Sequence, residues 1–127
     1  MQKTFIIAGS IIGLLAVVLG AFGAHSFEAS LQASGRLATY ETAARYQMYA
    51  ALALVLVGIL ADKFQASKWI NYAGWCFVIG SIVFSGSLYL ICLTGIKTWG
   101  AVAPIGGLLL MLGWLNICLA AINHKSN

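Results

Sequence analysis

The chain has 127 residues, of which 61% are hydrophobic and only 8% are charged, and its formal net charge is +4. A typical soluble domain carries about 25% charged residues, so this composition excludes an ordinary soluble domain. The basic residues are scattered along the chain without a run, which argues against nucleic-acid binding and favours loop charges that orient a membrane protein.

Four apolar stretches take up most of the chain, and each is about long enough to cross a bilayer core of ~30 Å as a helix. Residues 5–19 are continuously apolar or small, without the alternation of a barrel strand, so helices are expected. We therefore predict an all-α membrane protein, a single domain over residues 1–127, with four transmembrane helices in an antiparallel bundle. The four apolar stretches run over roughly Phe5–Ala24, Tyr46–Leu60, Ile70–Leu93 and Val102–Ile122.

The connection between the first two helices is the longest, and we predict a short surface helix within it. Ser26–Leu31 has the composition of such a helix, and Gly35 would end it. Thr39 could cap the next transmembrane helix. Pro104 falls near the start of the last helix, where a missing backbone N–H costs least.

The basic residues predict how the helices are oriented. Four helices place both termini on one side of the membrane, and that side carries a narrow excess of lysine and arginine. Because cytoplasmic loops are enriched in these residues, we expect both termini to be cytoplasmic. The residues that decide this are Lys3, Lys63, Lys68 and Lys125 on the cytoplasmic side, against Arg36, Arg45 and Lys97 on the outer side.

Small residues form a stripe along the first helix at intervals of three and four, and they recur at intervals of seven along the last helix. Small residues let membrane helices approach closely. These stripes are expected either to pack the helices inside the bundle or to form a surface for a homo-oligomer or a larger complex. The glycines of the stripes are Gly9, Gly13, Gly20, Gly23, Gly106 and Gly113.

Polar groups from three helices are predicted to converge near the outer membrane boundary. Ionisable groups at membrane depth are costly and tend to be paired or functional. One interpretation is a ligand or proton site. The other is anchoring, in which Arg45 reaches the headgroups, His25 caps the first helix and the serines bond their own backbone. The predicted cluster comprises His25, Glu41, Arg45, Gln47, Ser85 and Tyr89.

Catalytic and metal-binding motifs are not recognisable in the sequence, so we expect no catalytic residues, no metal and no cofactor. There is no GxSxG, HExxH or P-loop pattern, and the cysteines form no CxxC. Cys76 and Cys92 lie on one expected helix about 24 Å apart and cannot share a metal ion. Cys76 and Cys118 could lie at similar depth on neighbouring helices.

Six short motifs occur along the chain: Gly20–His25, Tyr46–Tyr49, Ala51–Leu54, Phe84–Tyr89, Pro104–Gly107 and Gly113–Trp114. In this order they resemble the small YgdD/YwdK-like membrane proteins, which are grouped as domain of unknown function 423. The resemblance implies a bacterial inner-membrane protein with four helices, and it implies no reaction. Family members usually carry a histidine where this chain has Ala50. His124 is expected on the opposite side of the membrane from His25, so a two-histidine metal site is doubtful.

Three functions are compatible with these patterns. The first, which we favour, is a non-enzymatic structural or assembly protein that contacts membrane lipid as a homo-oligomer or as a subunit of a larger complex. The second is a small transporter or channel component that uses the polar cluster. The third is a membrane enzyme acting on lipid or quinone, with His25 as acid or base and Glu28 or Glu41 orienting it.

Overall fold

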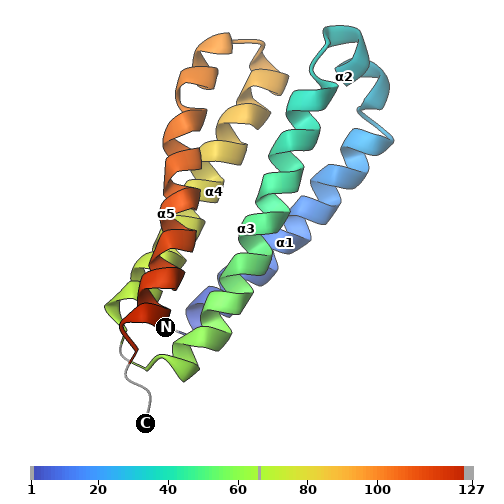
Figure 1. The fold of residues 1–127 in the computed structure, drawn as a ribbon. Helices are drawn as coiled ribbons and strands as arrows, with labels where there is room; N and C mark the ends of the chain where they lie inside the picture. Colours follow the sequence, from blue (N-terminus) through green and yellow to red (C-terminus); the bar gives the residue numbers. More distant parts are fainter. Residues whose placement is uncertain (1, 66, 125–127) are drawn as a thin grey trace.

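The computed structural model describes residues 2–65 and 67–124, and within them every long segment is helical (Figure 1). No strand occurs among these residues. Four of the helices are long and apolar enough to cross a membrane. The predicted all-α class with four spans and one short additional helix is therefore confirmed. The elements are α1 (Gln2–Ala24), α2 (Glu28–Ser34), α3 (Leu37–Lys63), α4 (Lys68–Thr94), η1 (Lys97–Ala101) and α5 (Ala103–Ile122).

The second spanning helix, α3, begins at Leu37, ahead of both the predicted cap at Thr39 and the apolar stretch that starts at Tyr46. Arg36 precedes its first turn without a side-chain cap, and Thr39 lies inside the helix, so the predicted cap at Thr39 is wrong. Residues 37–45 are rich in alanine, which favours helix. The polar residues among them make this segment less apolar than the stretch that follows it. The helix therefore extends beyond its most apolar part.

Helix α2 is the predicted short helix after the first span, and it ends as expected at Gly35. Gly35 adopts a left-handed conformation with φ of 72°, which is accessible to glycine because it lacks a Cβ. Its backbone N–H donates to the carbonyl of Gln32, and the N–H of Arg36 donates to the carbonyl of Leu31. This pair of bonds is a Schellman motif, which turns the chain directly from α2 into α3.

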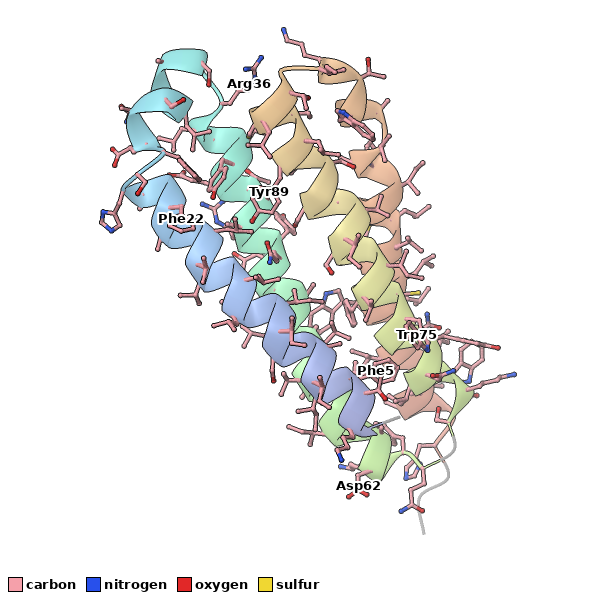
Figure 2. All side chains as sticks on the ribbon, turned by 180° about the vertical axis from the view of Figure 1, so that it is seen from behind. Phe5, Phe22, Arg36, Asp62, Trp75 and Tyr89 are labelled. Atoms are coloured by element: carbon pink, nitrogen blue, oxygen red, sulfur yellow. The ribbon has the colours of Figure 1, made fainter. Side chains whose placement is uncertain are left out.

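The four long helices form two antiparallel hairpins, α1 with α3 and α4 with α5, and α3 packs against α4 between them (Figure 1). Helices α2 and η1 lie at one end of the molecule, which we call the α2 end. Helix α1 starts and α5 stops at the opposite end, which we call the terminal end. Figure 2 shows α1 and α4 close together at Phe5 and Trp75, near the terminal end, and farther apart towards Phe22 and Tyr89.

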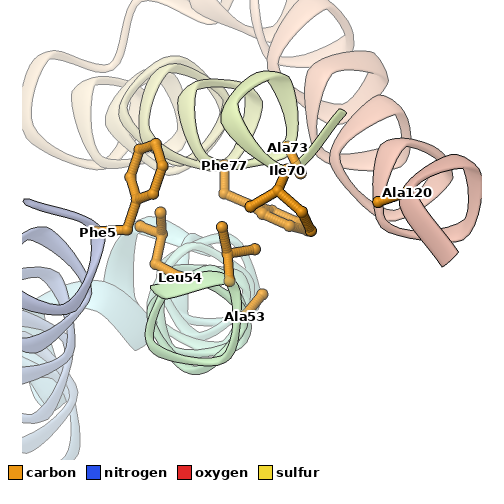
Figure 3. Close-up of a cluster of buried hydrophobic side chains, with 8 residues drawn as sticks. Phe5, Ala53, Leu54, Ile70, Ala73, Phe77 and Ala120 are labelled. Atoms are coloured by element: carbon orange, nitrogen blue, oxygen red, sulfur yellow. The ribbon is translucent and has the colours of Figure 1, made fainter. Parts of the chain in front are cut away.

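The buried core lies where the two hairpins converge, in the half of the molecule near the terminal end (Figure 3). The ring of Phe5 is fully buried and occupies the space that a Cβ at Gly74 would need. It meets Trp75 edge-on, with 5.8 Å between the ring centroids. The core residues are Phe5, Ala53, Leu54, Val57, Ile70, Ala73, Phe77 and Ala120.

Glycines of the predicted stripes lie mostly at helix contacts within each hairpin. A Cβ at Gly9 would lie 2.8 Å from the carbonyl oxygen of Ala51, and one at Gly113 would lie 2.8 Å from the ring of Phe77. At Gly23 the ring of Tyr40 fills this space, at Gly106 the backbone of Phe84 fills it, and Gly13 meets the Cβ of Ala51 at 3.4 Å. Gly20 differs, because a Cβ there would meet no atom within 4 Å.

Candidate functional site

Gln47 joins three helices at the centre of the polar region. Its side chain is buried in α3, only 8% exposed. The amide Nε2 donates to the carbonyl oxygen of Ile12 in α1 at 3.0 Å, and Oε1 accepts from the hydroxyl of Tyr89 in α4 at 2.7 Å. An amide in hydrocarbon is costly unless it is hydrogen-bonded. Gln47 therefore links one hairpin to the other and also ties α1 to α3.

Two further hydrogen bonds lie on the same face of α3, closer to the α2 end. Ser85 of α4 donates from Oγ to the carbonyl oxygen of Ala43 at 2.7 Å and is buried. The hydroxyl of Tyr40 donates to the carbonyl oxygen of Leu19 in α1 at 2.5 Å. The rings of Tyr40 and Tyr89 meet edge-on at a centroid separation of 5.3 Å. We call Tyr40, Gln47, Ser85 and Tyr89 the polar seam.

Tyr40 is absent from the predicted cluster, although the sequence contains a signal for it. It precedes Gln47 by two helical turns, a spacing that places both residues on one face of a helix. Tyr40 is 5% exposed, so its hydroxyl needs a partner inside the protein, and Leu19 supplies it.

Three of the six predicted residues do not join the polar seam. Glu41 and Arg45 are exposed, because at about 100° per residue they face away from the side of α3 that carries Ala43 and Gln47. His25 follows the last residue of α1 and is exposed. The structure therefore brings together Gln47 and Tyr89, with Ser85 beside them, and leaves the three ionisable side chains outside.

A shallow groove of about 220 Å³ lies beside the polar seam, between α1 and α4. Figure 2 shows Tyr89 in the space between these two helices. Part of the lining is small: Ser81, Ser85 and Gly86 come from α4, and a Cβ at Gly86 would meet no atom within 4 Å. We call this the α1–α4 groove. Its other lining residues are Ile12, Leu15, Leu19, Gln47, Ile82 and Tyr89.

The chemistry available at the polar seam is limited to one amide and three hydroxyl groups, each donating within the chain. Such groups fix helix positions and register. In the described ranges, no group of three or more histidine, cysteine, aspartate and glutamate side chains is placed to hold a metal ion. The arrangement is that of a hydrogen-bonded helix contact.

The amino-acid sequence is similar to those of known membrane proteins. A family model described as a protein of unknown function, DUF423, matches residues 19–107, a range that includes the whole polar seam. The UPF0382 membrane protein YwdK of Bacillus subtilis is 43% identical over 123 residues, which are 97% of this chain and 99% of that protein. The UPF0382 membrane protein SH2409 of Staphylococcus haemolyticus is 41% identical over 119 residues, 94% of this chain and 95% of that protein. No solved structure matches the chain at a significant level.

Proposed function

The chain belongs to the DUF423 family of membrane proteins, and from this premise we propose that it is a non-enzymatic structural or assembly protein. The proposed setting is the bacterial cytoplasmic membrane. The proposed activity is association with a second copy of the chain, or with a larger membrane complex to which it is an accessory subunit. Helix packing, rather than a reaction, is then the property on which its function depends.

The observation that carries this proposal is the large uncovered surface of the two outer helices. Helix α1 packs mainly on α3, and α5 packs mainly on α4. In the apolar spans, 17% of the residues of α1 and 22% of those of Lys97–Ile122 are buried, compared with 28% in α4 and 44% in α3. Membrane helices associate through close packing of small residues. The outer helices therefore have ample surface for a partner helix.

The α1–α4 groove is the contact surface that best suits a helix of a second copy. Its serine and glycine lining allows the close approach that membrane helix pairs require. Gly86 borders open space, so its small size serves no contact inside the chain. In this respect it differs from Gly106 and Gly113, whose lack of a Cβ is required by neighbouring atoms of α4.

The oligomeric state in a lipid bilayer tests this proposal. Labelled protein in vesicles, examined by single-molecule photobleaching, should show dimers or larger assemblies. Gly86→Leu should shift the population to monomers without unfolding the helices, because a Cβ at this position meets no atom within 4 Å. Ala121→Leu, at an exposed position of α5, is the matched control and should leave the assembly unchanged.

Wild-type protein that stays monomeric at every protein-to-lipid ratio, and that carries no partner out of native membranes in mild detergent, would contradict both forms of the proposal. A proton or ion flux through vesicles that contain the protein would instead support the transporter alternative. That alternative gains no specific support from the geometry, since Gln47, Ser85 and Tyr89 all donate or accept within the chain.

The proposed orientation has both termini in the cytoplasm. Lys3, Lys63 and Lys68 lie at the terminal end, whereas Arg36, Arg45 and Lys97 lie near the α2 end. Lys125, which contributes to the predicted excess, lies outside the described residues. Single cysteines placed at exposed Ser30 and Gln65, in a chain without its own cysteines, test the orientation. A membrane-impermeant maleimide added to intact spheroplasts should label the cysteine at position 30 and leave the one at position 65 unlabelled.

A further inference from the structure

A second groove lies on the other side of the α3–α4 contact, and its walls are aromatic. Helices α3, α4 and α5 enclose about 350 Å³, within the range of ~300–1,000 Å³ that ligand pockets occupy. A recess of about 270 Å³ continues from it, with Tyr49 and Trp114 bordering both spaces and Leu52 and Leu56 along the far wall. We call the two spaces together the aromatic groove. Its rings are those of Tyr46, Tyr49, Phe77, Phe84 and Trp114.

The depth of this groove is unusual for tyrosine and tryptophan. At 1.5 Å per residue, Tyr49 lies about 18 Å from the start of α3, a helix about 40 Å long, and Trp114 lies about 17 Å from the start of α5. Both residues therefore lie near the middle of the bilayer. Tyrosine and tryptophan are usually enriched at the two membrane interfaces, where water or headgroups can pair their polar atoms.

The polar atoms of the groove lack partners that other tyrosines of the chain have. The hydroxyls of Tyr40 and Tyr89 each donate to a group inside the protein. Within the described part of the chain, the hydroxyls of Tyr46 and Tyr49 and the indole N–H of Trp114 make no such hydrogen bond, and these side chains are 41%, 49% and 52% exposed. Hydrocarbon cannot pair these donors, so leaving them there is costly.

The ring arrangement defines what kind of molecule would fill the groove. Tyr46 contacts Tyr49 and Phe84 with centroid separations of 5.3 and 5.2 Å, and Phe77 contacts Trp114 at 5.3 Å. Aromatic walls gain stabilisation from a flat ring beyond that of burial alone. The free O–H and N–H donors complement carbonyl oxygens. A saturated acyl chain offers neither feature.

We propose that the aromatic groove binds a membrane quinone, whose flat ring carries two carbonyl acceptors and whose apolar tail follows the recess beside Leu52 and Leu56. The ring lies among the aromatic side chains, and the hydroxyl of Tyr49 donates to one of its carbonyl oxygens. The proposal concerns binding and includes no change in the oxidation state of the quinone. It is independent of association through the α1–α4 groove, which is lined by other residues on the opposite side of the α3–α4 contact.

Fluorescence quenching by decylubiquinone in vesicles tests the proposal. A variant with Trp69, Trp75 and Trp99 changed to phenylalanine reports from Trp114 alone, and a second variant that keeps only Trp75 serves as the control. Quenching of Trp114 should saturate with added quinone, whereas quenching of Trp75 should rise without saturation, as expected for a ligand dissolved in lipid. Excess decanol should not displace the quinone from Trp114.

Two changes in the groove separate specific binding from contact with dissolved quinone. Tyr49→Phe keeps the ring and removes the donor, so the quinone should bind about five- to tenfold more weakly. Tyr72→Phe, at an exposed position near the start of α4, should change nothing. Gly107→Leu should abolish saturation. A Cβ added there would lie 3.6 Å from the ring of Phe84, an ordinary contact distance, and the rest of the leucine side chain would occupy the groove.

The proposal is overturned if Trp114 and Trp75 are quenched alike without saturation. It is also overturned if decanol displaces the quinone, because the groove then accepts any alkyl chain. An unchanged affinity in Tyr49→Phe would remove the assigned hydrogen bond and with it the argument for a carbonyl-bearing ligand. Circular dichroism of each variant confirms that the helices remain folded.

Discussion

The contact between α4 and α5 and the contact between α3 and α4 are built from different groups. Along α4 and α5, glycine meets a neighbour that leaves no room for a Cβ, as Gly106 does at the backbone of Phe84 and Gly113 at the ring of Phe77. Along α3 and α4, hydrogen bonds of Ser85 and Tyr89 cross the contact at 2.7 Å. The first contact depends on shape, and the second can be weakened one bond at a time.

The largest expected effect is at the glycine contact. Gly106→Ala should lower the free energy of unfolding by about 1–3 kcal/mol, because the added methyl group meets backbone atoms of Phe84 and the two helices must separate. Unfolding by a denaturing detergent in mixed micelles measures this change. Gly86→Ala, on α4 with open space around it, is the control and should stay within about 0.5 kcal/mol of wild type. Equal losses in the two variants would contradict the distinction.

At the polar seam, Gln47→Leu should lower the free energy of unfolding by about 1–2 kcal/mol, since it removes two hydrogen bonds and leaves the hydroxyl of Tyr89 without a partner. Tyr89→Phe, combined with Gln47→Leu, removes the hydroxyl that would otherwise lack a partner. A double-mutant cycle should therefore give a coupling energy of about 0.6 kcal/mol between the two residues. Additive losses would show that the two side chains act separately and that the hydrogen bond between them contributes nothing.

A smaller effect is expected at Ser85, which donates across the contact to a carbonyl that already belongs to a helix. Ser85→Ala should lower the free energy of unfolding by about 0.6 kcal/mol, the average for hydrogen bonds between membrane helices. Ser87→Ala removes a bond from the serine to Val83 of its own helix and is the matched control, with little change expected. If Ser87→Ala were the more harmful change, the assignment of Ser85 to the contact would be wrong.

The smallest effect should come from His25, which lies outside both contacts. His25→Ala should leave the free energy of unfolding within about 0.5 kcal/mol of wild type, and the oligomeric state in vesicles should not change. A marked loss in either measurement would place His25 in an interface that the single chain does not reveal.

The sequence predicted the helices better than it predicted the faces they present to one another. Long apolar stretches identify membrane spans because the bilayer sets their length. The predicted cap at Thr39 was wrong, since the alanine-rich turns around it continue the helix. Within the predicted cluster, Gln47, Ser85 and Tyr89 do lie together in the polar seam. The exposure of Glu41 and Arg45 depends on how α3 is rotated, and apolar residues all round a membrane helix leave that rotation undetermined.

Gly20 and Gly106 show that spacing in the sequence does not reveal which glycines contact another helix. Both belong to regular stripes in the sequence, yet only Gly106 is required by a neighbouring backbone. Spacing along one helix shows which residues share a face. It does not show how far away the next helix lies, because that distance depends on the partner's side chains and on the angle between the two helices.

The long helices pack in their order along the chain, and this order affects how the protein assembles during synthesis. Each spanning helix packs on the one made just before it, from α1 with α3 to α4 with α5. Contacts between chain neighbours have low loop-closure cost and form quickly. The first hairpin, including the bonds of Tyr40 and Gln47 to α1, can therefore be complete before α4 leaves the ribosome. The nascent hairpin then exposes the acceptor Gln47 Oε1, to which the hydroxyl of Tyr89 donates once α4 has packed.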